Sequence, residues 1–128
     1  MAHDQHDEFA VESALDLEVG VVTGRDRIVV VVKGEVDYIN ADALESALNR
    51  AVAAGARQVV ADLQLVSFLG SDGLQALVGA RRRADAAGAE LYVVGAAHCV
   101  VQPIRVTGLA GPLKLRARMA DLPPAGGG

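Results

Sequence analysis

The spacing of the hydrophobic residues changes several times along this chain, and these changes constrain its fold more than any other feature. Apolar and polar residues alternate over residues 15–21, the period of two that is typical of a strand with one face in solvent. Residues 28–32 form a continuous β-branched run, which indicates a strand buried on both faces. From residue 41 to residue 54 the period lengthens, and Leu44, Leu48 and Val52 recur on one side of a predicted helix. A chain with this order of periods folds into a sheet covered by helices.

Further segments extend this pattern towards the C-terminus. Strands are predicted over residues 58–63, 90–94 and 113–118, and a second helix is predicted over residues 71–87. A third helix is expected within residues 99–107. Because proline is tolerated only in the first turn of a helix, Pro103 implies that this helix begins late, near Val100 or Val101. Asn40 and Gly55 are residues typical of the start and the end of the first helix.

The connections between these segments predict the topology. The short turn at residues 23–26 predicts an antiparallel pair of strands, whereas the later strands, each separated by a helix, run parallel. The predicted fold class is therefore α/β, with a mixed, mostly parallel sheet of about five strands in the order β-β-α-β-α-β-α-β, covered by helices. We expect one domain over residues 14–118, a flexible acidic tail at residues 1–13 and a disordered tail rich in Pro and Gly at residues 119–128.

The composition excludes several classes of function. The chain has 128 residues with 12 Lys and Arg against 16 Asp and Glu, and this net charge of −4 argues against a nucleic-acid partner. Two Tyr, two Phe and no Trp are too few aromatic rings to stack on nucleic-acid bases. No apolar run approaches the roughly 18 residues of a membrane helix, and the first residues lack the pattern of a secretory signal. We therefore expect a cytoplasmic protein with no nucleic-acid or membrane partner.

The sequence offers no set of residues for catalysis, for a metal or for a cofactor, and we expect no enzymatic activity. His3 and His6 lie in the expected tail, and His98 is adjacent to Cys99, where side chains rarely face each other for proton transfer. Cys99 is expected either as a small buried residue or, if exposed, as the site of an intermolecular disulfide. The arginines at residues 81–83 project about 100° apart around the second helix, so they indicate solvent-exposed faces and not a phosphate-binding patch.

Two polar segments interrupt the apolar pattern. Residues 34–40 follow the second predicted strand, and residues 67–74 follow the third. Because the carboxyl ends of parallel strands meet at one edge of a sheet, where open α/β sheets carry their functional loops, both segments are expected at one rim. Ser71 opens the second helix, where unpaired N–H groups and the helix dipole favour a negative charge. Ser71 is therefore expected either as a phosphate acceptor or merely as the N-cap of that helix.

These two segments, followed by residues 106–109, resemble the STAS domain of bacterial anti-sigma factor antagonists over about residues 15–118. The resemblance implies that Ser71 is phosphorylated. It implies that the unphosphorylated protein binds an anti-sigma factor, which is also a serine kinase, and so releases a sigma factor for transcription. Phosphorylation then separates the complex, and a serine phosphatase reverses the modification. The protein would be a monomer or a weak dimer, and its partner-binding residues would be Asp37, Tyr38, Asn40, Gly70, Ser71, Asp72, Gly73 and Leu74.

The second segment departs from the family pattern at two positions. Leu65 stands where the family has its first Asp, and Gly70 stands where the family has an Asp before the acceptor. Asp72 either substitutes for the missing carboxylate and leaves the switch working, or partly mimics a phosphate. It would mimic a phosphate poorly, because that group carries about −1.5 to −2 charges. The alternative function is an interaction module that is not phosphorylated, in a sensory complex or beside a lipid transporter. A phospho-aspartate receiver would need an acidic pair after the first strand and a lysine after the fifth, and neither is in place.

Overall fold

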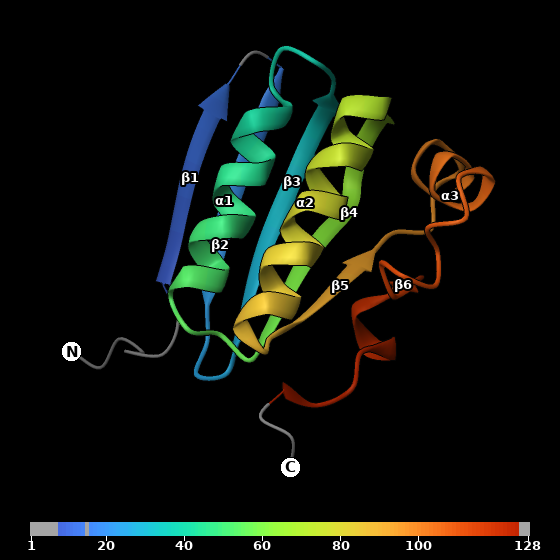
Figure 1. Ribbon diagram of the computed structural model, residues 1–128. Helices are drawn as coiled ribbons and strands as arrows, with labels where there is room; N and C mark the ends of the chain where they lie inside the picture. Colours follow the sequence, from blue (N-terminus) through green and yellow to red (C-terminus); the bar gives the residue numbers. More distant parts are fainter. Residues whose placement is uncertain (1–7, 15, 126–128) are drawn as a thin grey trace.

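The computed structural model describes residues 8–14 and 16–125, and over these residues six strands form one sheet in the order β1-β2-β3-β4-β5-β6 (Figure 1). The strands are β1 (Glu8–Ala14), β2 (Leu17–Thr23), β3 (Arg27–Val36), β4 (Gln58–Leu69), β5 (Glu90–Val94) and β6 (Leu115–Arg116). The helices are α1 (Ala41–Ala53), α2 (Ser71–Ala87) and α3 (His98–Val106), with a 3-10 turn, η1, at Met119–Asp121. Strands β1 to β3 are antiparallel, and β3 to β6 are parallel. The α/β class and the mixed, mostly parallel sheet are therefore confirmed, with one strand more than expected.

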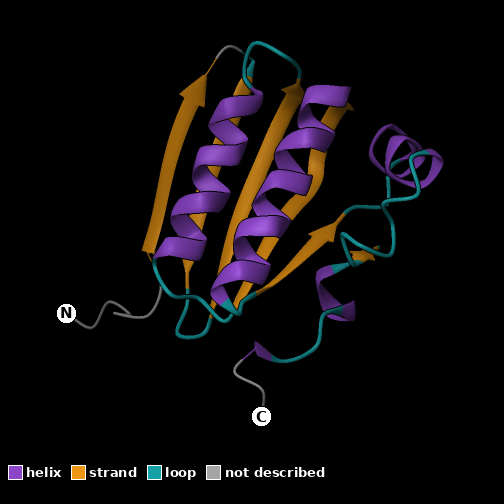
Figure 2. Ribbon diagram, in the orientation of Figure 1, coloured by secondary structure: helices purple, strands orange, loops and turns teal. Residues whose placement is uncertain are grey.

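The two longer helices, α1 and α2, lie side by side across one face of the sheet (Figure 2). Leu44 and Leu48 of α1 have no exposed surface, and neither have Val30 and Val32 of β3, the strand they cover. Burial of each such aliphatic side chain contributes about 1.5–3 kcal/mol. The apolar stripe of α1 that the sequence shows is thus the side of the helix that holds it on the sheet.

The third helix, α3, packs against β4 and begins earlier than the sequence predicts. It starts at His98, and Pro103 lies inside it. A proline in a helix interior is unfavourable by about 3 kcal/mol because it removes a hydrogen bond and crowds the preceding turn. Val100 and Ile104, one turn apart on the same face, have no exposed surface. The expected late start was wrong because burial of these two side chains, at about 1.5–3 kcal/mol each, outweighs the effect of the proline.

The N-terminal end of the chain departs from the expected tail within the described residues. β1 pairs with β2 along its whole length, from Glu8 opposite Thr23 to Ala14 opposite Leu17. The expectation of a tail was therefore wrong for residues 8–13, because their backbone groups complete the hydrogen bonding along the edge of β2. Residues 1–7 of the expected tail lie outside the described residues.

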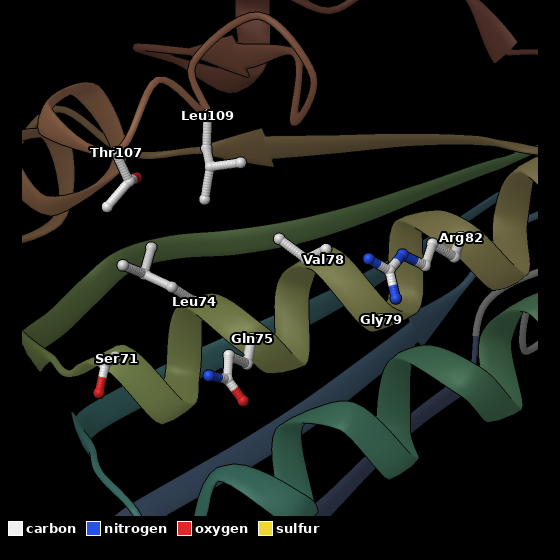
Figure 3. A pocket seen from close by; sticks show the side chains of 8 residues that line it. All are labelled: Ser71, Leu74, Gln75, Val78, Gly79, Arg82, Thr107 and Leu109. Atoms are coloured by element: carbon white, nitrogen blue, oxygen red, sulfur yellow. The ribbon is translucent and has the colours of Figure 1, made fainter.

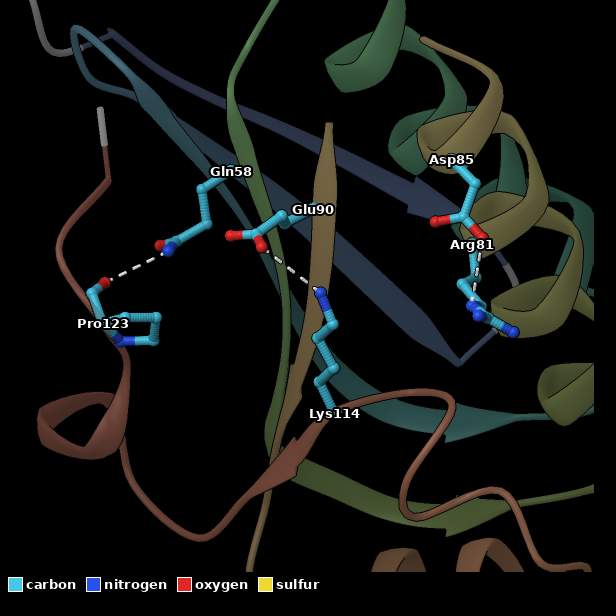
Figure 4. Close-up of polar contacts among 6 residues, drawn as sticks. All are labelled: Gln58, Arg81, Asp85, Glu90, Lys114 and Pro123. Atoms are coloured by element: carbon cyan, nitrogen blue, oxygen red, sulfur yellow. Dashed lines mark hydrogen bonds and ion pairs between the residues drawn. The ribbon is translucent and has the colours of Figure 1, made fainter. Parts of the chain in front are cut away.

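The C-terminal segment is held against the sheet, so the expected disorder was wrong for residues 119–123. The carbonyl oxygen of Pro123 accepts hydrogen bonds from Nη2 of Arg27 (2.9 Å) and from Nε2 of Gln58 (3.1 Å; Figure 4). Gln58 is only 1% exposed, and its Oε1 accepts a further hydrogen bond from Nε of Arg27. A buried carboxamide needs such partners, which fixes the segment at the start of β3 and β4. The strand expected at 113–118 shortens to β6, and residues 126–128 lie outside the described part.

Candidate functional site

The two polar segments of the sequence meet where β3 and β4 end. Val36, the last residue of β3, lies opposite Leu69, the last residue of β4, in the parallel register. The N–H of Gly70 donates a hydrogen bond to the carbonyl oxygen of Val36 at 2.9 Å, which ties the end of β4 to the end of β3. The expectation that both segments share one rim of the sheet is confirmed.

Ser71 is the first residue of α2, and it is exposed. The N-cap of the helix is Gly70, and the N–H of Leu74 donates to the carbonyl oxygen of Gly70 at 3.1 Å. Ser71 is therefore not the N-cap, and its side chain stays at the surface beside the unpaired N–H groups of the first turn. An anion attached to its oxygen would be stabilised by these groups and by the positive end of the helix dipole.

Gly73 and Leu74 are buried, although both belong to the expected partner-binding set. A Cβ built on Gly73 would lie 2.6 Å from Cδ1 of Leu69 and 2.8 Å from Cγ1 of Val36. Leu74 is 8% exposed and packs in the core. Only glycine lets the first turn of α2 approach β3 and β4 this closely. Gly73 therefore determines the position of Ser71 relative to the sheet.

The loop between β3 and α1 is held by its own side chains. Asn40 is 2% exposed, and its Oδ1 accepts from the N–H of Asp37 (3.0 Å) while its Nδ2 donates to the carbonyl of Glu35 (2.8 Å). Oδ1 of Asp37 in turn accepts from the N–H groups of Ile39 (3.0 Å) and Asn40 (3.3 Å). Asn40 occupies the N-cap position of α1 as expected, but its side chain makes no capping hydrogen bond there. Asp37 and Asn40 fix the shape of the loop instead.

Large apolar side chains are exposed at the same rim. Tyr38 is 76% exposed and Ile39 53% on the loop, and Phe68 is 49% exposed near the end of β4. We call Tyr38, Ile39, Phe68 and Ser71 the Ser71 surface. The pairing of β4 with β3 shifts register twice, and these irregularities break the alternation, so that Ser67 and Phe68 are both exposed. Sequence reasoning missed Ile39 and Phe68 as site residues; the available signal was a large apolar side chain inside a polar segment.

Of the two positions that depart from the family pattern, Gly70 lies directly before Ser71. A Cβ built on Gly70 would lie 3.2 Å from Cε2 of Phe68, so the glycine leaves room for this ring. Asp72 is exposed in the first turn of α2. The described rim therefore carries a carboxylate directly after Ser71 and none directly before it. Leu65, at the other departure, is 57% exposed on β4.

A groove of about 510 Å³ extends from Ser71 along α2 (Figure 3). Its second wall is the end of α3 and the segment that follows, where the Oγ1 of Thr107 donates to the carbonyl oxygens of Pro103 (2.8 Å) and Ile104 (3.0 Å). The groove is lined by Ser71, Leu74, Gln75, Val78, Gly79, Arg82, Thr107 and Leu109.

The histidine and cysteine that begin α3 are not among the residues that line the groove at Ser71. His98 is exposed, and Cys99 is half-buried with its Sγ donating to the carbonyl oxygen of Val66 at 3.4 Å. This contact fits the expectation of a packed thiol better than that of an exposed one. Within residues 8–14 and 16–125, no group of three His, Cys, Asp or Glu is placed to hold a metal. His3 and His6 lie outside these residues.

Comparisons with known proteins agree with this geometry. The sequence profile of the STAS domain matches residues 20–122. The anti-sigma-F factor antagonist RsfB of Mycobacterium tuberculosis is 34% identical over 88 residues, which are 69% of this chain and 71% of that protein. The crystal structure of an anti-sigma factor antagonist from Mycobacterium paratuberculosis has a TM-score of 0.76 at 33% identity, over 86% of this chain and 94% of that one. The unphosphorylated form of the anti-sigma factor antagonist SpoIIAA shares the fold, with a TM-score of 0.64 at 17% identity over 89% and 91% of the two chains.

None of the helices in the described part of the chain combines the length and the apolar character needed to span a lipid bilayer.

Proposed function

Because the chain belongs to the STAS domain family, we propose that it is an anti-sigma factor antagonist. In the unphosphorylated state it binds an anti-sigma factor that is also a serine kinase, and this binding frees a sigma factor for transcription. The similarity to RsfB and to the antagonist from Mycobacterium paratuberculosis, both above 30% identity, supports the antagonist role.

Ser71 is the phosphate acceptor in this proposal, and its exposed position at the first turn of α2 is the observation that carries it. The kinase transfers the γ-phosphoryl group of ATP to Oγ of Ser71. The bond between that group and ADP breaks, and the hydroxyl proton passes to a base of the kinase. A serine phosphatase later hydrolyses the new ester, which restores the hydroxyl and releases inorganic phosphate.

A phosphate on Ser71 separates the chain from the anti-sigma factor because the other side chains of the Ser71 surface are apolar. The Ser71 surface combines the hydroxyl with the exposed apolar side chains of Tyr38, Ile39 and Phe68. Such a surface suits an interface from which water is excluded. A phosphate adds about −1.5 to −2 charges in that contact, and removing such a charge from water is costly unless a cation faces it. The helix N-terminus stabilises the phosphate in the free protein, which also favours separation.

The expected partner-binding residues divide into two groups. Tyr38, Ser71 and Asp72 are exposed and touch the partner directly. The others act through the position of the backbone, because Asp37 and Asn40 fix the loop, while the set Gly70, Gly73 and Leu74 seats the start of α2 on the strands.

The proposal is tested with the purified serine-kinase anti-sigma factors of the chain's own organism. One of them is expected to bind the chain in calorimetry, and addition of Mg-ATP is expected to place one phosphate on Ser71 and to separate the two proteins. The variant Ser71→Ala binds but takes up no phosphate. Ser67→Ala, which changes another exposed serine of the same rim, takes up phosphate like the wild type. If no anti-sigma factor binds, the antagonist role is wrong; if Ser71→Ala is phosphorylated normally, the acceptor is wrong.

A second candidate function is an interaction module without phosphorylation, and Gly70 is the observation that favours it, since it removes the carboxylate that precedes the acceptor in the family. In that case the chain binds its partner stably, and Mg-ATP neither modifies Ser71 nor separates the complex.

A further inference from the structure

The groove beside α2 has two chemically different ends. Ser71 stands at one end and Arg82 at the other, eleven residues later on the same helix, which is about 16 Å at roughly 1.5 Å per residue. Leu74 and Val78 line the middle together with the polar Gln75, and Figure 3 shows Leu74 and Val78 directed across the groove towards Leu109. Ser71 is the point where the phosphate switch acts, but nothing in that switch accounts for Arg82.

Arg82 is the one charged residue among the eight described residues that line the groove. It is exposed, and in Figure 3 its guanidinium group turns back along α2 towards Val78. Its neighbour Arg81 is paired with Asp85 at 3.3 Å (Figure 4), whereas no ion pair of Arg82 occurs within the described part of the chain. Among the described residues, the groove therefore presents a cation without an ion pair next to the apolar side chains of Leu74 and Val78.

We propose that Arg82 selects the partner, because the groove accepts an apolar segment of the anti-sigma factor that carries an acidic side chain at the Arg82 end. This inference rests on the proposed function and names the chemistry of the partner at the same site. An arginine suits the role, since its planar group binds a carboxylate through two parallel hydrogen bonds while its stem covers apolar surface. Arginine is also enriched at the centres of protein interfaces.

The two ends of the groove act separately. The backbone positions of Ser71 and Arg82 are about 16 Å apart along α2 at roughly 1.5 Å per residue, so Arg82 is not placed to form an ion pair with a phosphate on Ser71. Arg82 then determines which anti-sigma factor docks, whereas Ser71 determines when it leaves.

The test compares charge reversal at two adjacent arginines. Arg82→Glu, Arg82→Lys and Arg83→Glu are titrated against the anti-sigma factor that binds the wild-type chain. Arg83 is the matched control, because it is also exposed on α2 but does not line the groove. Arg82→Glu is expected to raise Kd at least about tenfold and Arg83→Glu less than about twofold, with a smaller loss for Arg82→Lys, which keeps the charge. The difference between the two Glu variants is expected to shrink as salt is added.

Two further measurements separate this effect from other causes. Val78→Gln, which leaves the charge unchanged and makes this part of the groove polar, is expected to weaken binding as well. Arg82→Glu is expected to keep the wild-type melting curve, so a loss of binding does not come from unfolding. If Arg82→Glu and Arg83→Glu bind alike while the wild type binds, Arg82 does not select the partner, and the antagonist role stands. If no anti-sigma factor binds the wild type, the proposed function itself fails.

Discussion

Val36 and Gly73 meet across the interface between β3 and α2 so closely that a Cβ built on the glycine would lie 2.8 Å from Cγ1 of the valine. The same added carbon would lie 2.6 Å from Cδ1 of Leu69. Both side chains belong to the core, so neither can move away without disturbing its neighbours. The distance between the first turn of α2 and the ends of the strands, and with it the height of Ser71 above the sheet, is set by this contact.

Gly73→Ala is therefore expected to destabilise the protein. Alanine is normally better than glycine in a helix by about 1 kcal/mol. The crowding against Val36 and Leu69 outweighs this gain, and we expect a net loss of about 1–2 kcal/mol in the free energy of unfolding, measured with urea. Gly111→Ala serves as the control, because a Cβ built there meets no atom within 4 Å. Equal stability of the two variants would contradict the packing argument.

Gly79→Ala, in the middle of the same helix, is expected to stabilise the protein, in contrast to Gly73→Ala. A Cβ there would lie 2.6 Å from Oε2 of Glu45, which is the end of a flexible side chain and can rotate away. The helix propensity of alanine then dominates, and the free energy of unfolding is expected to rise by up to about 1 kcal/mol. A decrease in the urea midpoint would show that the carboxylate of Glu45 is held in place.

Asn40→Ala is expected to loosen the loop that carries Tyr38. The change removes the acceptor of the Asp37 N–H and the donor to the Glu35 carbonyl in a buried position. Buried polar groups left without partners cost about 1–3 kcal/mol of stability, and the affinity for the anti-sigma factor should fall as the loop loses its shape. Ser46→Ala, an exposed change on α1, should lower neither quantity.

Asp72→Asn tests whether the carboxylate after Ser71 substitutes for the one missing at Gly70. We expect phosphorylation of Ser71 to slow by at least about threefold, because the carboxylate that follows Ser71 in the first turn is lost. The double variant Gly70→Asp with Asp72→Asn is expected to restore the rate. Asp42→Asn removes the equivalent carboxylate from the first turn of α1, so it should lower stability by about 0.3–1 kcal/mol without affecting phosphorylation. A normal rate of phosphorylation in Asp72→Asn would show that Asp72 does not replace the carboxylate missing at Gly70.

Removal of residues 123–128 is expected to lower the free energy of unfolding by about 1–3 kcal/mol. The carboxamide of Gln58 and the guanidinium of Arg27 then lose the carbonyl of Pro123 as acceptor, and Gln58 is almost fully buried. Removal of residues 126–128 alone keeps Pro123 and should leave the urea midpoint where it is. A comparison of the two truncations distinguishes the loss of the Pro123 hydrogen bonds from a general effect of shortening the chain.

The parts of the fold that sequence predicts best are those with a strong local period. The stripe of Leu44, Leu48 and Val52 predicts α1 almost to the residue, because burial of that stripe is what holds the helix. The start of α3 is not predictable from Pro103 alone, because packing of Val100 and Ile104 depends on a strand far away in the sequence. The same holds for β1, whose acidic composition suggests a tail while its pairing depends on the edge of β2.

The candidate site divides in the same way. Ser71 at the start of α2 follows from the local pattern, and so does the N-cap position of Asn40. The exposure of Phe68 does not, because it arises from the register shifts between β4 and β3. The groove that ends at Arg82 brings α2 together with Leu109, and no local spacing indicates that two such distant segments form one surface.

The bonds from Pro123 to Arg27 and Gln58 hold the last described residues at the amino ends of β3 and β4, and Glu8 begins β1 opposite Thr23 at that same edge (Figure 1). Both ends of the described chain thus leave from the margin farthest from Ser71. A neighbouring domain, an affinity tag or a surface linker joined at that margin would begin at the side of the sheet opposite the rim, so immobilised protein should still expose Ser71 to an approaching enzyme.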